Sequence, residues 1–161
     1  MVSIFIFLYL NIYSDAGAGG EKVLWQAIKA LQNHNKFNNK QYNIHILVYS
    51  ASSLTLKEIL KIKVKERFGL EISEKNLHLI NLDKELANTL DPQNYPTLTL
   101  LWQAIASIRV AFNACYVMPC DIFVDTMGVA FGYPFIQLFF PCKIYSYTHY
   151  PMLSQDMVNT V

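Results

Sequence analysis

The chain has 161 residues, a formal net charge of +1, 53% hydrophobic residues and 16% charged residues. This length fits one domain with a core of its own, and the composition excludes a disordered protein. The small share of charged residues indicates that part of the surface is covered by a partner or a membrane. The lysines are spread along the chain, so no nucleic-acid partner is expected, and the basic series in residues 57–67 fits the solvated face of a helix.

The first part of the chain predicts a strand, a helix and a second strand. Residues 2–13 are mostly apolar, but the run is shorter than the about 20 residues that cross a membrane and lacks a basic leader, which favours a buried strand. A small-residue segment, 14–20, follows, and Glu21 opens a helical pattern with one apolar face. The apolar run 44–49 is typical of a strand that is buried on both faces of a parallel sheet.

The rest of the chain continues to alternate helices and strands. Residues 54–68 predict an amphipathic helix that ends at Gly69, and residues 77–80 predict a third strand. After a loop with two prolines, the pattern predicts a long helix, a strand, a short helix and a final strand at 97–118, 121–125, 129–140 and 143–148. This alternation predicts one α/β domain over residues 1–161, with a Rossmann-like, open, mostly parallel sheet and right-handed crossovers.

Two apolar segments, 98–118 and 126–142, have compositions that could contact lipid. The first contains Arg109 as its one charged residue, and the second contains none. The second also contains two glycines and two prolines and directly follows Asp125. A buried or interfacial element is therefore favoured over a membrane crossing.

The cysteines Cys115, Cys120 and Cys142 are an odd number and include no CxxC pair, and the four histidines lie far apart in the sequence. This spacing indicates neither a zinc site nor a disulfide framework. Reduced thiols that face the cytosol are the simplest interpretation.

Three loops are expected at the carboxyl ends of strands, which is the edge where open α/β sheets bind ligands. The segment 17–21 combines glycine amides with the positive end of a helix and fits a phosphate, although a tight turn that packs the helix on the sheet explains the same residues. The second loop begins at Asp125, and the third contains Tyr147, His149 and Tyr150. An imidazole can bind a sugar hydroxyl or a phosphate and tyrosine rings suit carbohydrate, but a lone histidine is often structural.

Three blocks of residues resemble one family. Residues 13–25, YSDAGAGGEKVLW, are similar to the glycine-rich opening motif of the endoplasmic-reticulum GDP-mannose-dependent α-1,2-mannosyltransferases of asparagine-linked glycosylation. Residues 125–128, DTMG, and 146–151, SYTHYP, resemble two further blocks of that family. The chain departs from the family at Asn11-Ile12, where His-Pro is usual, and at Ala18, where glycine is usual.

The resemblance implies the amino-terminal half of a two-domain GT-B glycosyltransferase. Such an enzyme adds α-1,2-linked mannose from GDP-mannose to a dolichol-diphosphate-linked oligosaccharide at the cytosolic face of the endoplasmic reticulum membrane, without a metal or other cofactor. Carried over by position, the site residues are His149 as the catalytic residue at the transferred sugar, Gly17, Gly19, Gly20 and Glu21 at the donor diphosphate, and Asp125, Tyr147 and Tyr150 lining the cleft.

Within this family the chain is expected to be inactive by itself. It begins at the first strand without the family's membrane anchor and ends at Val161, before the nucleotide-sugar domain that stabilises charge on the leaving diphosphate. A second hypothesis is a non-catalytic, membrane-peripheral module that binds the lipid-linked acceptor or a partner glycosyltransferase half. Exposed apolar residues within 98–118 would favour this second hypothesis.

Overall fold

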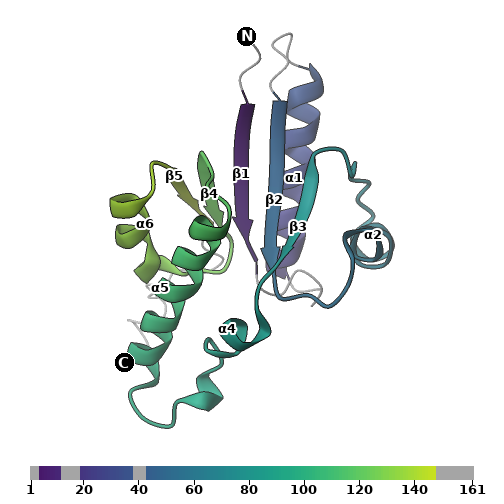
Figure 1. Cartoon of the computed structure of the whole chain (residues 1–161). Helices are drawn as coiled ribbons and strands as arrows, with labels where there is room; N and C mark the ends of the chain where they lie inside the picture. Colours follow the sequence, from purple (N-terminus) through teal and green to yellow (C-terminus); the bar gives the residue numbers. More distant parts are fainter. Residues whose placement is uncertain (1–3, 12–18, 38–42, 148–161) are drawn as a thin grey trace, which may run out of the picture.

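A parallel sheet forms the centre of the protein. The computed structural model describes residues 4–11, 19–37 and 43–147. In this described part, five parallel strands are ordered β3-β2-β1-β4-β5 (Figure 1). The strands are β1 (Ile4–Leu10), β2 (Asn43–Ser50), β3 (Leu77–Asn81), β4 (Ile122–Asp125) and β5 (Lys143–Ser146). The predicted Rossmann-like, open α/β sheet is confirmed.

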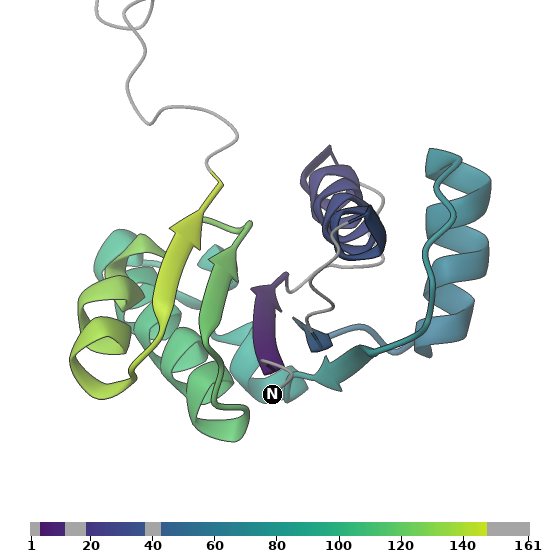
Figure 2. The same ribbon diagram turned by 90° about the horizontal axis from the view of Figure 1, so that it is seen from above.

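Helices cover both faces of the sheet (Figure 2). On one face, α1 (Gly19–Phe37) and the helical segment 56–68 bury a cluster that includes Leu24, Trp25, Ile28, Ile59 and Val64. On the other face, α5 (Thr99–Val117) and α6 (Tyr133–Phe139) bury a cluster that includes Val110, Ala111, Ala114 and Ile136. The chain leaves β1 toward one side of the sheet and reaches β4 from the other side, so both faces are covered.

The predicted helix 54–68 forms one continuous helical segment. It consists of α2 (Leu56–Glu58), the π-helical stretch η1 (Ile59–Lys65) and α3 (Glu66–Phe68). Thr55 and Glu58 form a capping box at its start, and Gly69 ends it with a left-handed φ of 65°. Most of its basic residues are exposed, as the sequence predicted for a solvated helix face.

Several boundaries and short elements differ from the prediction. Helix α1 already begins at Gly19, so two glycines of the predicted loop belong to its first turn, and it extends through the polar residues to Phe37. The predicted proline-containing loop holds α4 (Lys84–Asn88), which Asp83 caps, and the short 3-10 turn η2 (Pro92–Asn94). The short helix predicted at 129–140 is a 3-10 turn, η3 (Ala130–Gly132), followed by α6.

Helix α5 is the one helix in the described part that is long and apolar enough to cross a membrane by length and composition, and 33% of its apolar window is buried inside the fold. Core helices of soluble proteins pass the same test. The inner face of α5, with Val110, Ala111 and Ala114, packs against the sheet. The structure thus makes α5 a sheet-covering helix.

The buried Tyr9 in β1 should make the fold sensitive to alkali. Burial raises the pKa of Tyr9 from 10.0 to about 12. Because the folded state holds this proton more tightly, the stabilisation is present below about pH 10 and is lost as the pH rises toward 12, by about 1.4 kcal/mol per pH unit. Urea unfolding across this range should show a shallower decrease in the Tyr9→Phe variant than in the unchanged chain. Identical pH dependence in the two proteins would contradict the assignment to Tyr9.

Candidate functional site

The carboxyl ends of β1 and β4 lie next to each other in the sheet. The two strands are paired in parallel, and Leu10 of β1 stands opposite Asp125 of β4. The chain runs from β1 to α1 on one face and from β4 to α6 on the other face (Figure 2). This is the topological switch point of the sheet, where open α/β folds bind ligands. The loops that follow β1 and β4 therefore start next to each other at the carboxyl edge of the sheet.

Two buried polar side chains join the strand ends at this point. Asn11 Nδ2 donates a hydrogen bond of 3.2 Å to Thr126 Oγ1, which in turn donates to the Leu10 carbonyl at 3.1 Å. The backbone amide of Asn11 also donates to the Tyr49 carbonyl at 3.1 Å, which links β1 to β2. Asn11 stands where the family usually has histidine, and the sequence does not predict this linking role. The available signal was a polar residue placed directly after a buried strand.

Asp125 organises the loop that follows β4. Its side chain is fully buried. Its carboxylate accepts hydrogen bonds from the backbone amides of Met127 at 2.7 Å, Gly128 at 3.0 Å and Val129 at 2.7 Å, and from the Tyr133 hydroxyl. Burial, together with the hydrogen bond to Asp125, raises the pKa of Tyr133 to about 12, so the hydroxyl remains a donor at neutral pH. The carboxylate is thus held by the protein itself.

Tyr147 lies beside this loop, as its predicted place in the cleft requires. It directly follows β5, its backbone amide donates to the Asp125 carbonyl at 2.8 Å, and its side chain is 47% exposed. The prediction assigns Asp125 and Tyr147 to one cleft, and the structure places the two residues side by side. That they contact a substrate stays a prediction.

The start of α1 places Gly20 and Glu21 at the same edge of the sheet. Glu21 is 2% exposed, and Trp25 Nε1 donates to its Oε1 at 3.4 Å. A carboxylate in the first turn also interacts favourably with the positive end of the helix. Gly17, His149 and Tyr150 lie outside the described residues. The donor-phosphate role of this segment and the catalytic role of His149 therefore stay predictions.

A cleft that the sequence did not predict opens between α4 and α5, with a volume of about 700 Å³. Its wall combines charged, amide and aromatic side chains, including Asp83, Glu85, Arg109, Phe112, Asn113 and Tyr116. The Tyr49 hydroxyl donates to Asn113 Oδ1, which fixes one side of the cleft to β2. The signal in the sequence was the pair Arg109 and Asn113, polar residues four positions apart that share one face of an otherwise apolar helix.

One group of described side chains could hold a metal ion. The sulfur atoms of Cys115, Cys120 and Cys142 all lie within 4.8 Å of one another. They cluster near the start of β4 and β5, at the amino-terminal edge of the sheet and thus opposite the switch point. Their spacing in the sequence did not indicate this proximity.

The parallel sheet and its switch point define a Rossmann-like α/β domain, the fold of the amino-terminal half of a glycosyltransferase. A family model described as ALG11 mannosyltransferase N-terminus matches residues 4–161. The chain belongs to this family. The resemblance inferred from the three sequence blocks is confirmed.

Curated relatives support the same assignment. Proteins named GDP-Man:Man(3)GlcNAc(2)-PP-Dol alpha-1,2-mannosyltransferase match this chain with 35% identity in Kluyveromyces lactis, 34% in Caenorhabditis elegans and 33% in Dictyostelium discoideum. These alignments cover 93%, 95% and 95% of this chain, but 25%, 31% and 28% of the relatives. The chain therefore spans between a quarter and a third of the length of these relatives.

Proposed function

We propose that the chain is the acceptor-side, amino-terminal domain of a glycosyltransferase that adds α-1,2-linked mannose from GDP-mannose to a dolichol-diphosphate-linked oligosaccharide, for protein N-glycosylation. The observation that carries this proposal is the family match over residues 4–161. Relatives that align with more than nine-tenths of the chain are named for this activity. The cytosolic face of the endoplasmic reticulum membrane is the proposed location.

Within this function, the candidate site residues have separate roles. The segment from Gly17 to Glu21 borders the donor diphosphate, because glycine amides and a helix start favour an anion. His149 contacts the transferred sugar, and Tyr147 and Tyr150 line the cleft. Asp125 acts as a positioning residue, because its carboxylate already binds the amides of its own loop.

The cleft between α4 and α5 is the proposed place for sugars of the acceptor. Carboxylates, a guanidinium and an amide can exchange hydrogen bonds with several sugar hydroxyls, and the rings of Phe112 and Tyr116 supply apolar faces. Arg109 lies at the exposed side of the cleft. It is the residue in the cleft suited to a negatively charged part of the acceptor.

We also propose that these 161 residues transfer no mannose by themselves. Charge that develops on a leaving diphosphate needs preorganised donors around it. This chain covers 25% to 31% of the curated relatives, so about two-thirds or more of each relative lies outside the aligned region. Mannose transfer thus requires residues of the kind that these additional regions supply.

Two preparations test the proposal. The 161-residue chain and a graft, in which residues 4–161 replace the matched region of the Kluyveromyces lactis relative, are each incubated with GDP-mannose and the Man(3)GlcNAc(2)-PP-Dol acceptor. We expect added mannose from the graft and none from the chain alone. A folded, GDP-mannose-binding graft without transfer would refute the domain assignment, and transfer by the chain alone would refute its inactivity.

The graft also tests the cleft between α4 and α5. In the graft, Arg109→Ala should weaken acceptor binding while leaving GDP-mannose binding unchanged.

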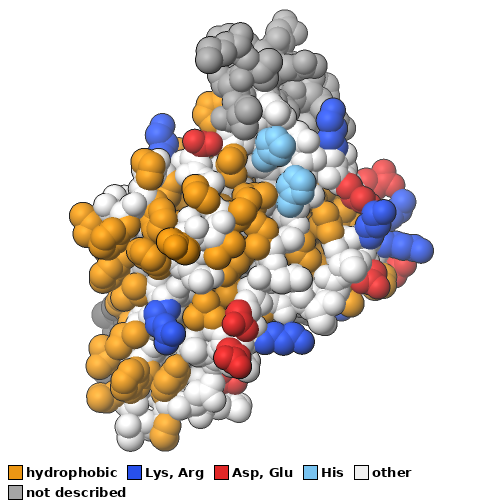
Figure 3. All heavy atoms as spheres, viewed as in Figure 1, with side chains coloured by type: hydrophobic (Ala, Val, Ile, Leu, Met, Phe, Trp, Pro, Cys, Tyr) orange, Lys and Arg blue, Asp and Glu red, His pale blue; other side chains and the backbone are white. Residues whose placement is uncertain are grey.

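The second candidate function, a membrane-peripheral module, is favoured by one specific observation. The amino-terminal half of α5 and the residue before it carry exposed apolar side chains, and together they form the α5 apolar surface: Leu98, Leu100, Leu101, Trp102 and Ile105. Hydrophobic side chains gather over α5 and α6, whereas charged side chains gather near α2 (Figure 3). An apolar surface of this kind suits contact with lipid. This role is compatible with the enzyme domain and does not depend on it.

Flotation of the chain with phospholipid vesicles tests this surface. Leu100 is 83% exposed, so Leu100→Asp should leave the fold intact and weaken vesicle binding about tenfold or more, because a leucine anchor is replaced by a charge. Ile62→Asp is the matched control, since Ile62 is 47% exposed on the basic helical segment of the opposite face. Equal losses in both variants, or no flotation of the unchanged chain, would exclude the α5 apolar surface as a lipid-binding site.

A further inference from the structure

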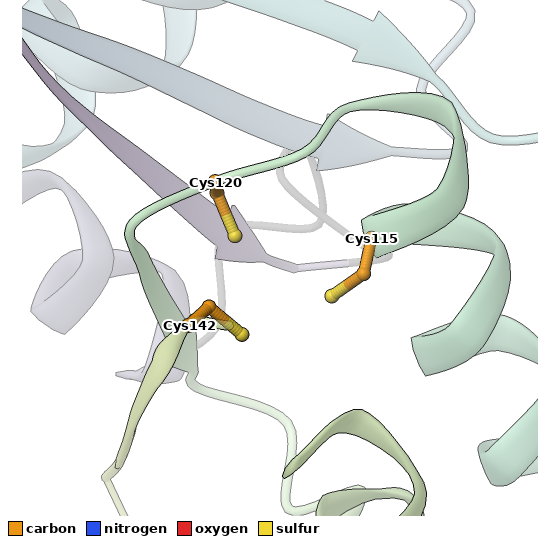
Figure 4. Close-up of side chains that lie close together, drawn as sticks. All are labelled: Cys115, Cys120 and Cys142. Carbon is orange, nitrogen blue, oxygen red and sulfur yellow. The ribbon is translucent and has the colours of Figure 1, made fainter. Parts of the chain in front are cut away.

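Three cysteines from separate segments converge at the amino-terminal edge of the sheet. Cys115 lies in the last turn of α5, Cys120 lies shortly before β4, and Cys142 directly precedes β5. Figure 4 shows their side chains directed toward one another. Cys115 is 1% exposed, and the other two are half-buried. The cluster is therefore enclosed on one side and accessible on the other.

We propose that Cys115, Cys120 and Cys142 together bind one thiophilic cation, for which Zn²⁺ is the natural choice. Cysteine sulfur is the ligand that such cations prefer, and three protein ligands with one open position make a known form of zinc site. The half-buried side of the cluster leaves room for a water molecule as the fourth ligand. This inference does not rest on the proposed transferase function.

The sulfur positions favour a shared metal over a disulfide. Zinc–sulfur bonds of about 2.3 Å in a tetrahedron place sulfur atoms about 3.8 Å apart. The three sulfur atoms already lie within 4.8 Å of one another, so metal binding requires shifts of about 1 Å or less. A disulfide requires about 2.05 Å between two sulfur atoms, and it would leave the third thiol unpaired.

Metal binding at the cluster should release protons, because the thiolate is the form of cysteine that binds a metal.

The expected role of the cation is to join structural elements. β4 and β5 are paired from Ile122 opposite Lys143 onward, and the Lys143 amide donates to the Asp121 carbonyl at 2.9 Å. A metal bound at the cluster would tie the start of this edge pair to the end of α5. β5 is an edge strand of four residues, so we expect an additional link to stabilise this strand most.

Zinc titration of the reduced 161-residue chain tests the proposal, with a chromophoric chelator as competitor. We expect one equivalent of Zn²⁺ to bind and excess Zn²⁺ to raise Tm by about 5 °C or more. Co²⁺ in the same site should give the absorption of thiolate-to-metal charge transfer. Bound Zn²⁺ should also slow alkylation of the half-buried Cys120 and Cys142, as measured by mass spectrometry, and this readout needs no variant.

Three variants separate the cluster from adventitious binding. Cys142→Ala should weaken Zn²⁺ binding at least about 100-fold, and Cys142→Asp, which restores a ligand atom, should recover part of the loss. His78→Ala removes an exposed imidazole that stacks on His45 and lies outside the cluster, so it should change nothing. The proposal is overturned if His78→Ala abolishes binding, if Zn²⁺ does not protect the cysteines from alkylation, or if two of them form a disulfide in air and the reduced chain takes up no metal.

Discussion

Replacing Asp125 with alanine is expected to lower the free energy of unfolding by about 4 kcal/mol, among the larger effects of a single substitution. The carboxylate is fully buried and satisfies the amides of Met127, Gly128 and Val129. Alanine leaves these donors without their acceptor, and each unsatisfied buried donor costs about 1–3 kcal/mol. Equilibrium unfolding in urea measures the change.

Two control variants separate this effect from the loss of any one hydrogen bond. Tyr133→Phe removes the hydroxyl donor and keeps the carboxylate, so we expect a loss of about 1 kcal/mol. Asp83→Ala removes an exposed carboxylate that caps α4 through the Glu85 amide, which should also cost about 1 kcal/mol. If Asp125→Ala costs no more than these controls, the carboxylate does not hold the loop as described.

Replacing Gly132 with valine is expected to destabilise the protein by about 3 kcal/mol, with about 2 kcal/mol for alanine. Gly132 is buried where η3 meets α5, and an added Cβ would lie 2.8 Å from the Cβ of Ala111. This atom belongs to a short side chain in the middle of α5, so the clash can be relieved only by moving one helix. Thermal and urea unfolding should both report the loss.

A double-mutant cycle identifies the clash as the cause. Ala111→Gly alone should cost about 1 kcal/mol, because glycine lowers helix stability. In the background of Ala111→Gly, however, Gly132→Ala should cost much less than in the unchanged chain, since the opposing Cβ is gone. Additive losses in the double variant would show that the contact between α5 and η3 is not what excludes a side chain at Gly132.

The order of helices and strands could be read from the sequence because their signals are local. The continuous apolar run in β2 marks a strand buried on both faces, and Gly69 marks a helix end that requires a left-handed φ. Helix α4 and the first turn of α1 have weak local signals. The five residues of α4 are too few to show a helical period, and α1 begins with two glycines, whose helix propensity is low.

The edge of the sheet at which the candidate loops lie could be predicted. The loops after β1, β4 and β5 were assigned to one edge because the carboxyl ends of parallel strands must meet there. The binding of Asp125 to its own loop was not predicted, since nothing in the residues around it shows where a carboxylate will point. The polar cleft between α4 and α5 was also missed, because its two walls are separate in the chain and only their packing creates it.

The fold class and the family could be assigned from the sequence, together with the edge of the sheet where a site is expected, because alternation, strand ends and motif blocks are properties of neighbouring residues. Which distant side chains meet depends on the tertiary structure. Cys115 and Cys142 come together only because the end of α5 and the start of β5 pack into one core cluster. Asn11 meets Thr126 only because β4 pairs with β1. Contacts of this kind depend on the strand order of the sheet, which no single segment of the sequence encodes.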